Sequence, residues 1–157
     1  MHGQLSEDTV VEVPAAVLWK VYHGVELGKL AAQLLPDVFG RVEVLEGDGG
    51  VGTIVKVTYP PGTPGPGYVK EMFTNIDNEM RLKETEVIEG GPKAAGFDVY
   101  RIRLQILEKD AESSIIRTSV EYEIDDKLAE MASKSKVTVE RLGTLAQVIA
   151  KHLKQNK

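Results

Sequence analysis

Two stretches, FDVYRIRLQIL at residues 97–107 and SIIRTSVEYEI at residues 114–124, decide the fold class of this chain. In each of them apolar side chains alternate with polar or charged ones at every second position. Successive side chains of a β-strand point to opposite faces, so this period of two predicts strands with one apolar and one solvated face. A sheet with one wet face is typical of antiparallel pairing.

The alternation also predicts which side chains face the protein interior. On the first strand these are Tyr100, Ile102, Leu104 and Ile106, and on the second they are Ile116, Thr118, Val120, Tyr122 and Ile124. Further strands are predicted at 4–13, 42–45 and 53–59, with two more around a turn at 77–79. Pro/Gly-rich runs at 60–67 and 90–92 predict breaks between strands.

Helices are predicted at three places. Pro14 favours the start of a short helix ending at Gly24, because a proline in the first turn loses no hydrogen bond. A second short helix is predicted over 26–35. A long helix is predicted from about Leu128 to Lys154, where apolar residues recur at helical spacing, with a kink or fraying at 133–136. The order of elements predicts one α+β domain, residues 1–157, with the long helix packed on an antiparallel sheet.

The composition narrows the classes of function. The 157 residues are 42% hydrophobic and 27% charged, which suits one folded domain with a core. The net charge is −5 and no basic stripe is present, so no nucleic-acid partner is expected. The chain has no cysteine and its three histidines lie far apart, so neither a disulfide nor a metal site is expected. A polar N-terminus and the absence of a long apolar span predict a cytosolic protein with no membrane contact.

The glycine-rich stretch EGDGGVGT at 46–53 has two interpretations. Glycine-rich backbone can hold phosphate, but this stretch lacks the Gly-Lys-Ser/Thr ending and the following helix of a phosphate-binding loop. A tight turn between two strands, with glycines at positive φ, is the favoured interpretation.

Two ionisable residues, Glu71 and Lys83, fall on a face that is otherwise apolar. If residues 77–79 form a three-residue turn, Phe73 lies opposite Lys83 and Glu71 lies opposite Thr85. Glu71 and Lys83 would then be diagonal neighbours pointing into the interior, whereas a two-residue turn would put them on opposite faces. Burial moves the pKa of such groups toward neutrality and suits them to proton transfer, although a solvated surface pair is the alternative.

The glycine-rich stretch resembles the loop of the plant class-ten pathogenesis-related proteins, the birch pollen allergen family. The phrase from Phe73 through DNEMRLK at 77–83, together with IEGG at 88–91, is similar to the norcoclaurine-synthase-like and norbelladine-synthase-like branch. The resemblance implies a seven-stranded curved antiparallel sheet wrapped around the long C-terminal helix, with two short helices after the first strand. It also implies an internal cavity that binds small plant metabolites.

The resemblance further implies roles for individual residues. Lys83 and Glu71 match the catalytic lysine and glutamate of the synthases. Tyr68 is the candidate for their catalytic tyrosine, although it stands one position early: strict alternation points it outward, and a bulge beside it would turn it inward. The substrate-binding candidates are Val69, Phe73, Asp98, Tyr100, Ile102 and Phe39. Ile102 replaces an aspartate of the norcoclaurine synthases, which argues against norcoclaurine formation itself.

Two functions follow as hypotheses. The first is a Pictet–Spengler or imine-forming enzyme that condenses a phenolic ethylamine, of dopamine or tyramine type, with an aromatic aldehyde, without metal or cofactor. Lys83 would protonate the departing oxygen, and Glu71 would take a proton from the amine or from the ring carbon during closure. The second is a non-catalytic carrier of phytohormones or other apolar metabolites, since such sites are apolar with few polar anchors. A ribonuclease fits badly with an acidic chain that lacks a histidine pair. A monomer or weak dimer is expected.

Overall fold

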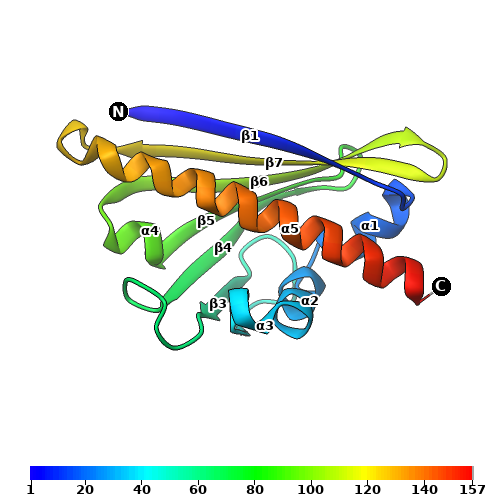
Figure 1. The fold of residues 1–157 in the computed structure, drawn as a ribbon, viewed down its shortest axis with the longest axis horizontal. Helices are drawn as coiled ribbons and strands as arrows, with labels where there is room; N and C mark the ends of the chain where they lie inside the picture. The colour runs from blue at the N-terminus through cyan, green and yellow to red at the C-terminus, as the bar shows by residue number, and fades with distance from the viewer. Residues whose placement is uncertain (157) are drawn as a thin grey trace.

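One antiparallel sheet forms the body of the protein (Figure 1). The computed structural model describes residues 1–156, and its strand order is β1-β7-β6-β5-β4-β3-β2. The strands are β1 (His2–Val11), β2 (Arg41–Glu46), β3 (Ile54–Thr58), β4 (Tyr68–Asp77), β5 (Leu82–Gly90), β6 (Phe97–Asp110) and β7 (Ser113–Ile124). Strands β6 and β7 pair antiparallel, with Tyr100 opposite Tyr122 and Leu104 opposite Thr118. The predicted seven-stranded antiparallel sheet is confirmed.

Short helices connect the strands. They are α1 (Ala15–Tyr22), α2 (Glu26–Leu34), α3 (Pro36–Phe39) and α4 (Gly91–Ala94). The two helices predicted after the first strand are α1 and α2, whereas α3 and α4 were not predicted. Pro36 follows the predicted helix 26–35 and Pro92 belongs to the predicted break at 90–92, yet each lies in the first turn of one of these single-turn helices. The fixed φ of proline suits that position, so the same residue both ends one element and begins another.

The C-terminal helix begins later than predicted. Residues Asp126–Ser133 form a 3₁₀ segment, and the α-helix α5 spans Lys134–Gln155. The kink lies at Leu128, where φ is −110°, rather than at 133–136. Asp125 starts the 3₁₀ segment by accepting a hydrogen bond from the backbone N–H of Lys127 at 2.9 Å. No helix in the described part of the chain is long and apolar enough to span a membrane.

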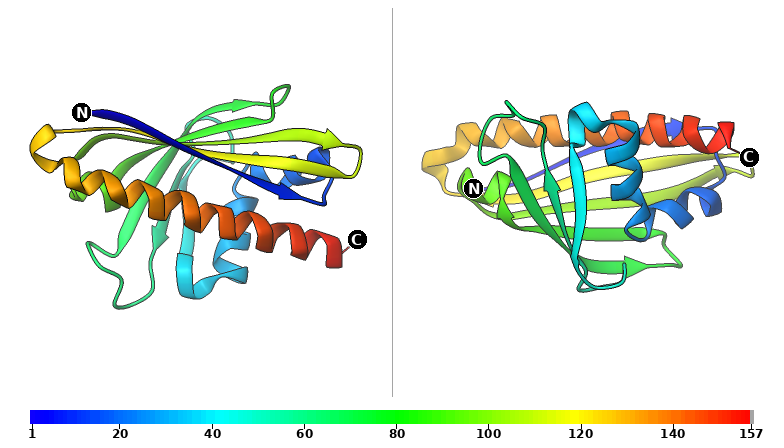
Figure 2. Two further views of the ribbon diagram at one scale, coloured as in Figure 1. Left: turned by 45° about the horizontal axis from the view of Figure 1, so that its top comes forward. Right: turned by 90° about the horizontal axis from the view of Figure 1, so that it is seen from below.

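Helix α5 lies in the concave side of the sheet, which curls around it (Figure 2). Its buried apolar side chains are Val139, Leu145, Ala146, Ile149 and Ala150. Each large apolar side chain buried in this way contributes roughly 1.5–3 kcal/mol. The helix contacts β1, β7 and α2, so it joins one edge of the sheet to the short helices. This arrangement leaves room between α5 and the middle strands.

The convex face of the sheet carries paired charges instead of a second layer. Arg101 binds Glu121 at 2.6 Å and Glu86 at 3.4 Å, and Arg103 binds Glu84 at 3.4 Å. These residues alternate with the buried ones on β5, β6 and β7, as the period of two predicted. The charged face is therefore the wet one, and every buried ionisable group on the other face needs a separate explanation.

The glycine-rich stretch is a turn between β2 and β3. Gly47 has φ of 91°, and a Cβ there would lie 2.5 Å from the Thr53 hydroxyl oxygen, so only glycine fits. The backbone N–H of Gly49 donates to Thr53 Oγ1 at 2.9 Å, and that of Gly50 donates to Asp48 Oδ1 at 3.0 Å. These amides are already engaged within the turn, which supports the turn interpretation over phosphate binding.

Candidate active site

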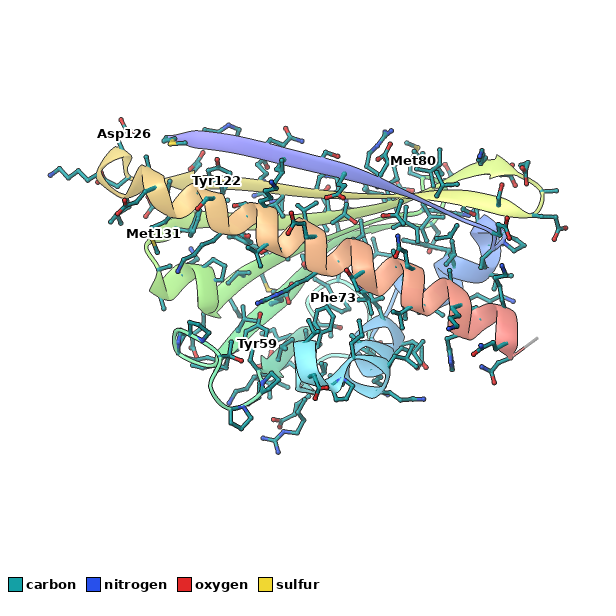
Figure 3. All side chains as sticks on the ribbon, in the orientation of Figure 1. Tyr59, Phe73, Met80, Tyr122, Asp126 and Met131 are labelled. Atoms are coloured by element: carbon teal, nitrogen blue, oxygen red, sulfur yellow. The ribbon has the colours of Figure 1, made fainter. Side chains whose placement is uncertain are left out.

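A cavity of about 150 Å³ lies between α5 and the concave face of the sheet. Its wall is mostly apolar and is built from β2, β3, β4, β5 and β6 on the sheet side and from α2, α3 and α5 on the other. Apolar lining residues include Leu27, Val55, Val57, Leu104, Leu142 and Leu145. Figure 3 shows Phe73, another lining residue, beside α5 in the same region. The internal cavity implied by the resemblance is present.

The strands β4 and β5 place Glu71 and Lys83 in this cavity through a different register from the predicted one. Lys83 lies opposite Ile76 rather than Phe73, and Glu71 lies opposite Val87 rather than Thr85. The connecting turn, 78–81, has four residues between the paired residues Asp77 and Leu82. An even-length turn alone would have put Glu71 and Lys83 on opposite faces.

A β-bulge restores the shared face. The pairing of β4 with β5 shifts between Phe73 and Asn75, so Thr74 is an extra residue on β4. One extra residue reverses the alternation upstream of it, which turns Phe73 and Glu71 back to the side of Lys83. The longer turn has a local cause, because Asp77 Oδ1 accepts hydrogen bonds from the backbone N–H groups of Glu79 and Met80, both at 3.0 Å.

Lys83 is the most deeply buried ionisable side chain of the cavity, with 3% of its surface exposed. Its Nζ donates a hydrogen bond to the backbone oxygen of Gly24 at 2.8 Å and lies 3.9 Å from the centre of the Phe73 ring. Desolvation lowers its pKa from 10.5 to about 8, and the nearby Glu71 carboxylate opposes that shift. A lysine with this pKa gives up and regains a proton close to neutral pH.

Glu71 is half-buried and lines the same cavity. Its Oε1 accepts a hydrogen bond from the Thr85 hydroxyl at 3.0 Å. Desolvation raises the pKa of Glu71, while the Thr85 hydrogen bond and the charge of Lys83 lower it by less. Among the described residues Glu71 and Lys83 form no direct ion pair. Burial therefore shifts the pKa of each group toward neutrality, and because the two are not paired with each other a ligand can bind between them.

Tyr68 does not line the cavity, so the structure favours the outward one of its two predicted orientations. Its hydroxyl donates to Glu89 Oε2 at 2.8 Å on the outer face, and Lys56 Nζ lies 5.2 Å from its ring centre. Tyr68 lies opposite Thr58 in the pairing of β3 with β4, and the bulge of β4 comes after it at Thr74. Strict alternation therefore holds at Tyr68 and points it outward.

Asp98 is the second predicted site residue that lies outside. The pairing of β6 with β7 shifts between Phe97 and Val99, so Asp98 is the extra residue of a bulge and its side chain is exposed. The bulge leaves Phe97 and Tyr100 both facing inward, with their rings packed edge to face at 5.0 Å. The Tyr100 hydroxyl is hydrogen-bonded to Thr138 Oγ1 on α5 at 2.7 Å.

The remaining predicted site residues divide into two groups. Phe39, Phe73 and Ile102 line the cavity. Val69 and Tyr100 face inward and are buried, but they belong to the packed cluster beside the cavity rather than to its lining.

Four polar lining residues were not among the predicted site residues: Tyr59, Thr85, Thr138 and Arg141. Tyr59 continues the alternation of Val55 and Val57, a signal that the proline-rich run after it obscured. Thr138 and Arg141 precede Leu142 and Leu145 on one face of α5, at helical spacing. Among the described residues, no three histidine, aspartate or glutamate side chains gather where they would hold a metal ion.

The fold and the cavity define a class of protein: a curved antiparallel sheet wrapped around a C-terminal helix, with a mostly apolar internal cavity that contains Glu71 and Lys83. The chain belongs to the pathogenesis-related protein Bet v 1 family, whose profile matches residues 1–156.

Two curated relatives are named synthases. The chain is 48% identical to norbelladine synthase of Narcissus pseudonarcissus, over all of this chain and 95% of that protein. It is 38% identical to S-norcoclaurine synthase 2 of Papaver somniferum, over 94% of this chain and 63% of that protein. Among solved structures, norcoclaurine synthase from Thalictrum flavum in complex with dopamine and hydroxybenzaldehyde superposes with a TM-score of 0.87. That pair is 32% identical and covers 100% of this chain and 89% of the other.

Proposed function

We propose that this protein is an enzyme that condenses a phenolic ethylamine with an aromatic aldehyde through an imine. The observation that carries the proposal is the pair Glu71 and Lys83, whose pKa values are both moved toward neutrality in a cavity that is otherwise apolar. The similarity to norbelladine and norcoclaurine synthases supports a condensation of this type. In this proposed reaction, residues 1–157 act as one domain.

The proposed chemistry uses the two buried groups in sequence. The neutral amine nitrogen attacks the aldehyde carbon, Glu71 takes the proton that the nitrogen loses, and Lys83 protonates the carbonyl oxygen, which gives the carbinolamine. Glu71 then passes its proton to Lys83, and Lys83 donates it to the hydroxyl oxygen, which leaves as water. Glu71 takes the remaining N–H proton of the iminium to give the imine, and its transfer to Lys83 restores both groups. The cavity holds both reactants together and keeps bulk water away from the imine.

Ring closure after imine formation requires a further proton removal from the aromatic carbon that attacks. Ile102 supplies no carboxylate at its position in the cavity wall, and Asp98 points away from the cavity. Glu71 is then the one carboxylate among the described lining residues. We therefore propose the open imine as the product that leaves the site.

The test is product formation from a panel of amine and aldehyde pairs, with the imine trapped by a mild hydride reductant. The wild-type protein should exceed the uncatalysed background, and Lys83→Ala and Glu71→Gln should each reduce the rate by at least about tenfold. Lys56→Ala is the matched control, because Lys56 lies on the outer face of β3, between Val55 and Val57, and is not a lining residue. Circular dichroism checks that each variant is folded.

The alternative is a non-catalytic carrier of apolar plant metabolites. The apolar wall of the cavity and the fold shared with pollen allergens, such as Bet v 1-C of Betula pendula at 30% identity, favour it as the second candidate. Wild-type protein that binds these phenols in the cavity but never exceeds the background rate would refute the enzyme and leave the carrier.

A further inference from the structure

A second cluster of polar side chains, Tyr59, Thr138 and Arg141, lines the cavity beyond Glu71. Tyr59 follows the end of β3, which pairs with the Tyr68 end of β4, whereas Lys83 lies toward the opposite end of that strand, beside Ile76. Arg141 and Thr138 reach the cavity from α5, and Thr138 is bonded to Tyr100. Figure 3 shows Tyr59 and Phe73 on the same side of α5.

The strand pairing gives the order of these groups along the cavity, because Lys83 lies beside Ile76, Glu71 lies in the middle of β4, and Tyr59 lies beyond the pair Thr58 and Tyr68. The charge of Glu71 acts on the pKa of Lys83, and the charges of both Glu71 and Arg141 act on the pKa of Tyr59. Desolvation is the largest cause that raises the pKa of Tyr59 to about 12. The polar groups on the sheet therefore run from Lys83 through Glu71 to Tyr59, and Arg141 on α5 is the exposed residue among the polar lining groups, so we take it to lie at the mouth.

Tyr59 and Arg141 have hydrogen-bonding groups that the described part of the protein leaves unused. Neither the Tyr59 hydroxyl nor the Arg141 guanidinium makes a hydrogen bond within the described residues, and Arg141 joins none of the ion pairs found there. A guanidinium with free N–H groups binds anionic oxygen strongly, because such hydrogen bonds are charge-assisted. A neutral phenol beside it adds one more donor.

We propose that Tyr59 and Arg141 are the specificity site for the aldehyde, and that they select aromatic aldehydes with a hydroxyl para to the carbonyl, bound as the phenolate. This inference rests on the proposed function. Conjugation with the para carbonyl spreads the phenolate charge, so this phenol loses its proton more readily than the phenol of an ethylamine. The ammonium group of the amine is repelled by Arg141 and attracted by Glu71. The aldehyde ring then spans from the mouth inward, with its carbonyl directed toward Lys83.

The experiment compares 4-hydroxybenzaldehyde, 4-methoxybenzaldehyde and benzaldehyde with one amine, in the wild type, Arg141→Gln and Tyr59→Phe. In the wild type kcat/KM should favour the hydroxylated aldehyde. Arg141→Gln should reduce that preference by about tenfold or more, and Tyr59→Phe should reduce it by less, since one neutral hydrogen bond is weaker than a charged one. Lys136→Gln is the matched control, because it removes an exposed charge from α5 outside the cavity lining.

A second readout needs no turnover. The ultraviolet absorbance of bound 4-hydroxybenzaldehyde reports its phenolate, so a pH titration gives the apparent pKa of the bound phenol. Wild-type protein and Lys136→Gln should lower that pKa relative to free aldehyde, and Arg141→Gln should restore it. An unchanged aldehyde preference and an unchanged phenolate titration in Arg141→Gln would overturn the inference. So would a phenolate signal that is lost in Lys83→Met and kept in Arg141→Gln. Phenolate binding without turnover would refute the proposed function alone.

Discussion

Replacing Lys83 by methionine should stabilise the protein near neutral pH and remove its activity. The burial that moves the pKa of Lys83 from 10.5 to about 8 also measures the cost of keeping its charge inside. One pH unit of pKa corresponds to about 1.4 kcal/mol, so the charged side chain costs about 3 kcal/mol in the folded state. Methionine has a similar length and carries no charge.

Part of that gain is offset by lost contacts. The Gly24 oxygen loses its hydrogen bond from Nζ, and the Phe73 ring loses its cation. These contacts contribute roughly 1–2 kcal/mol together. The expected net increase in the free energy of unfolding is therefore about 1–2 kcal/mol. Chemical denaturation near neutral pH measures it, and Lys56→Met on the outer face of β3 should change the free energy by less than about 0.5 kcal/mol.

The pH dependence gives the sharper test. Between the folded pKa of about 8 and the ordinary value of 10.5, the unfolded chain holds the Lys83 proton and the folded protein does not. The wild type therefore gains stability from this group as pH rises through that window, whereas Lys83→Met does not. The advantage of the variant should shrink accordingly. A variant that is less stable than wild type by more than about 1 kcal/mol near neutral pH would show that Lys83 is a structural contact, and would refute the reasoning.

Three further results are expected. The rate should fall as pH rises above about 8, because Lys83 then loses the proton that it donates. The rate should also fall in acid, because Glu71, whose pKa is raised above 4.5, gains a proton there. A rate profile that stays level to strongly alkaline pH would contradict the role of Lys83. Tyr68→Phe should keep kcat/KM within about twofold, because the hydroxyl binds only Glu89 on the outer face, and a large loss would return Tyr68 to the site. Gly90→Ala should lower the melting temperature and reduce the free energy of unfolding by about 1–3 kcal/mol. The reason is that φ of Gly90 is 73° and an added Cβ would lie close to the Tyr68 backbone oxygen. Thermal unfolding that matches the wild type would contradict this strain.

The amino-acid sequence by itself determined the antiparallel sheet, the short helices α1 and α2 and the long closing helix. These features depend on periodicity, which is local: a period of two on β6 and β7 and a helical stripe on α5 specify one apolar face each. The sequence also brought Glu71 and Lys83 forward as candidates, because charged residues on an apolar face are unusual. The resemblance to the norcoclaurine-synthase-like branch then indicated the type of reaction.

Only the tertiary structure decided which side chains enter the cavity. The predicted turn at 77–79 was too short, yet the bulge at Thr74 turned Glu71 back to the side of Lys83. The bulge at Asp98 places that candidate outside the cavity, and no extra residue beside Tyr68 turns it inward. A bulge depends on the pairing of two strands, and one extra residue exchanges the faces of everything beyond it. For the same reason Arg141, distant in sequence from both strands, joins the site only when α5 lies across the sheet.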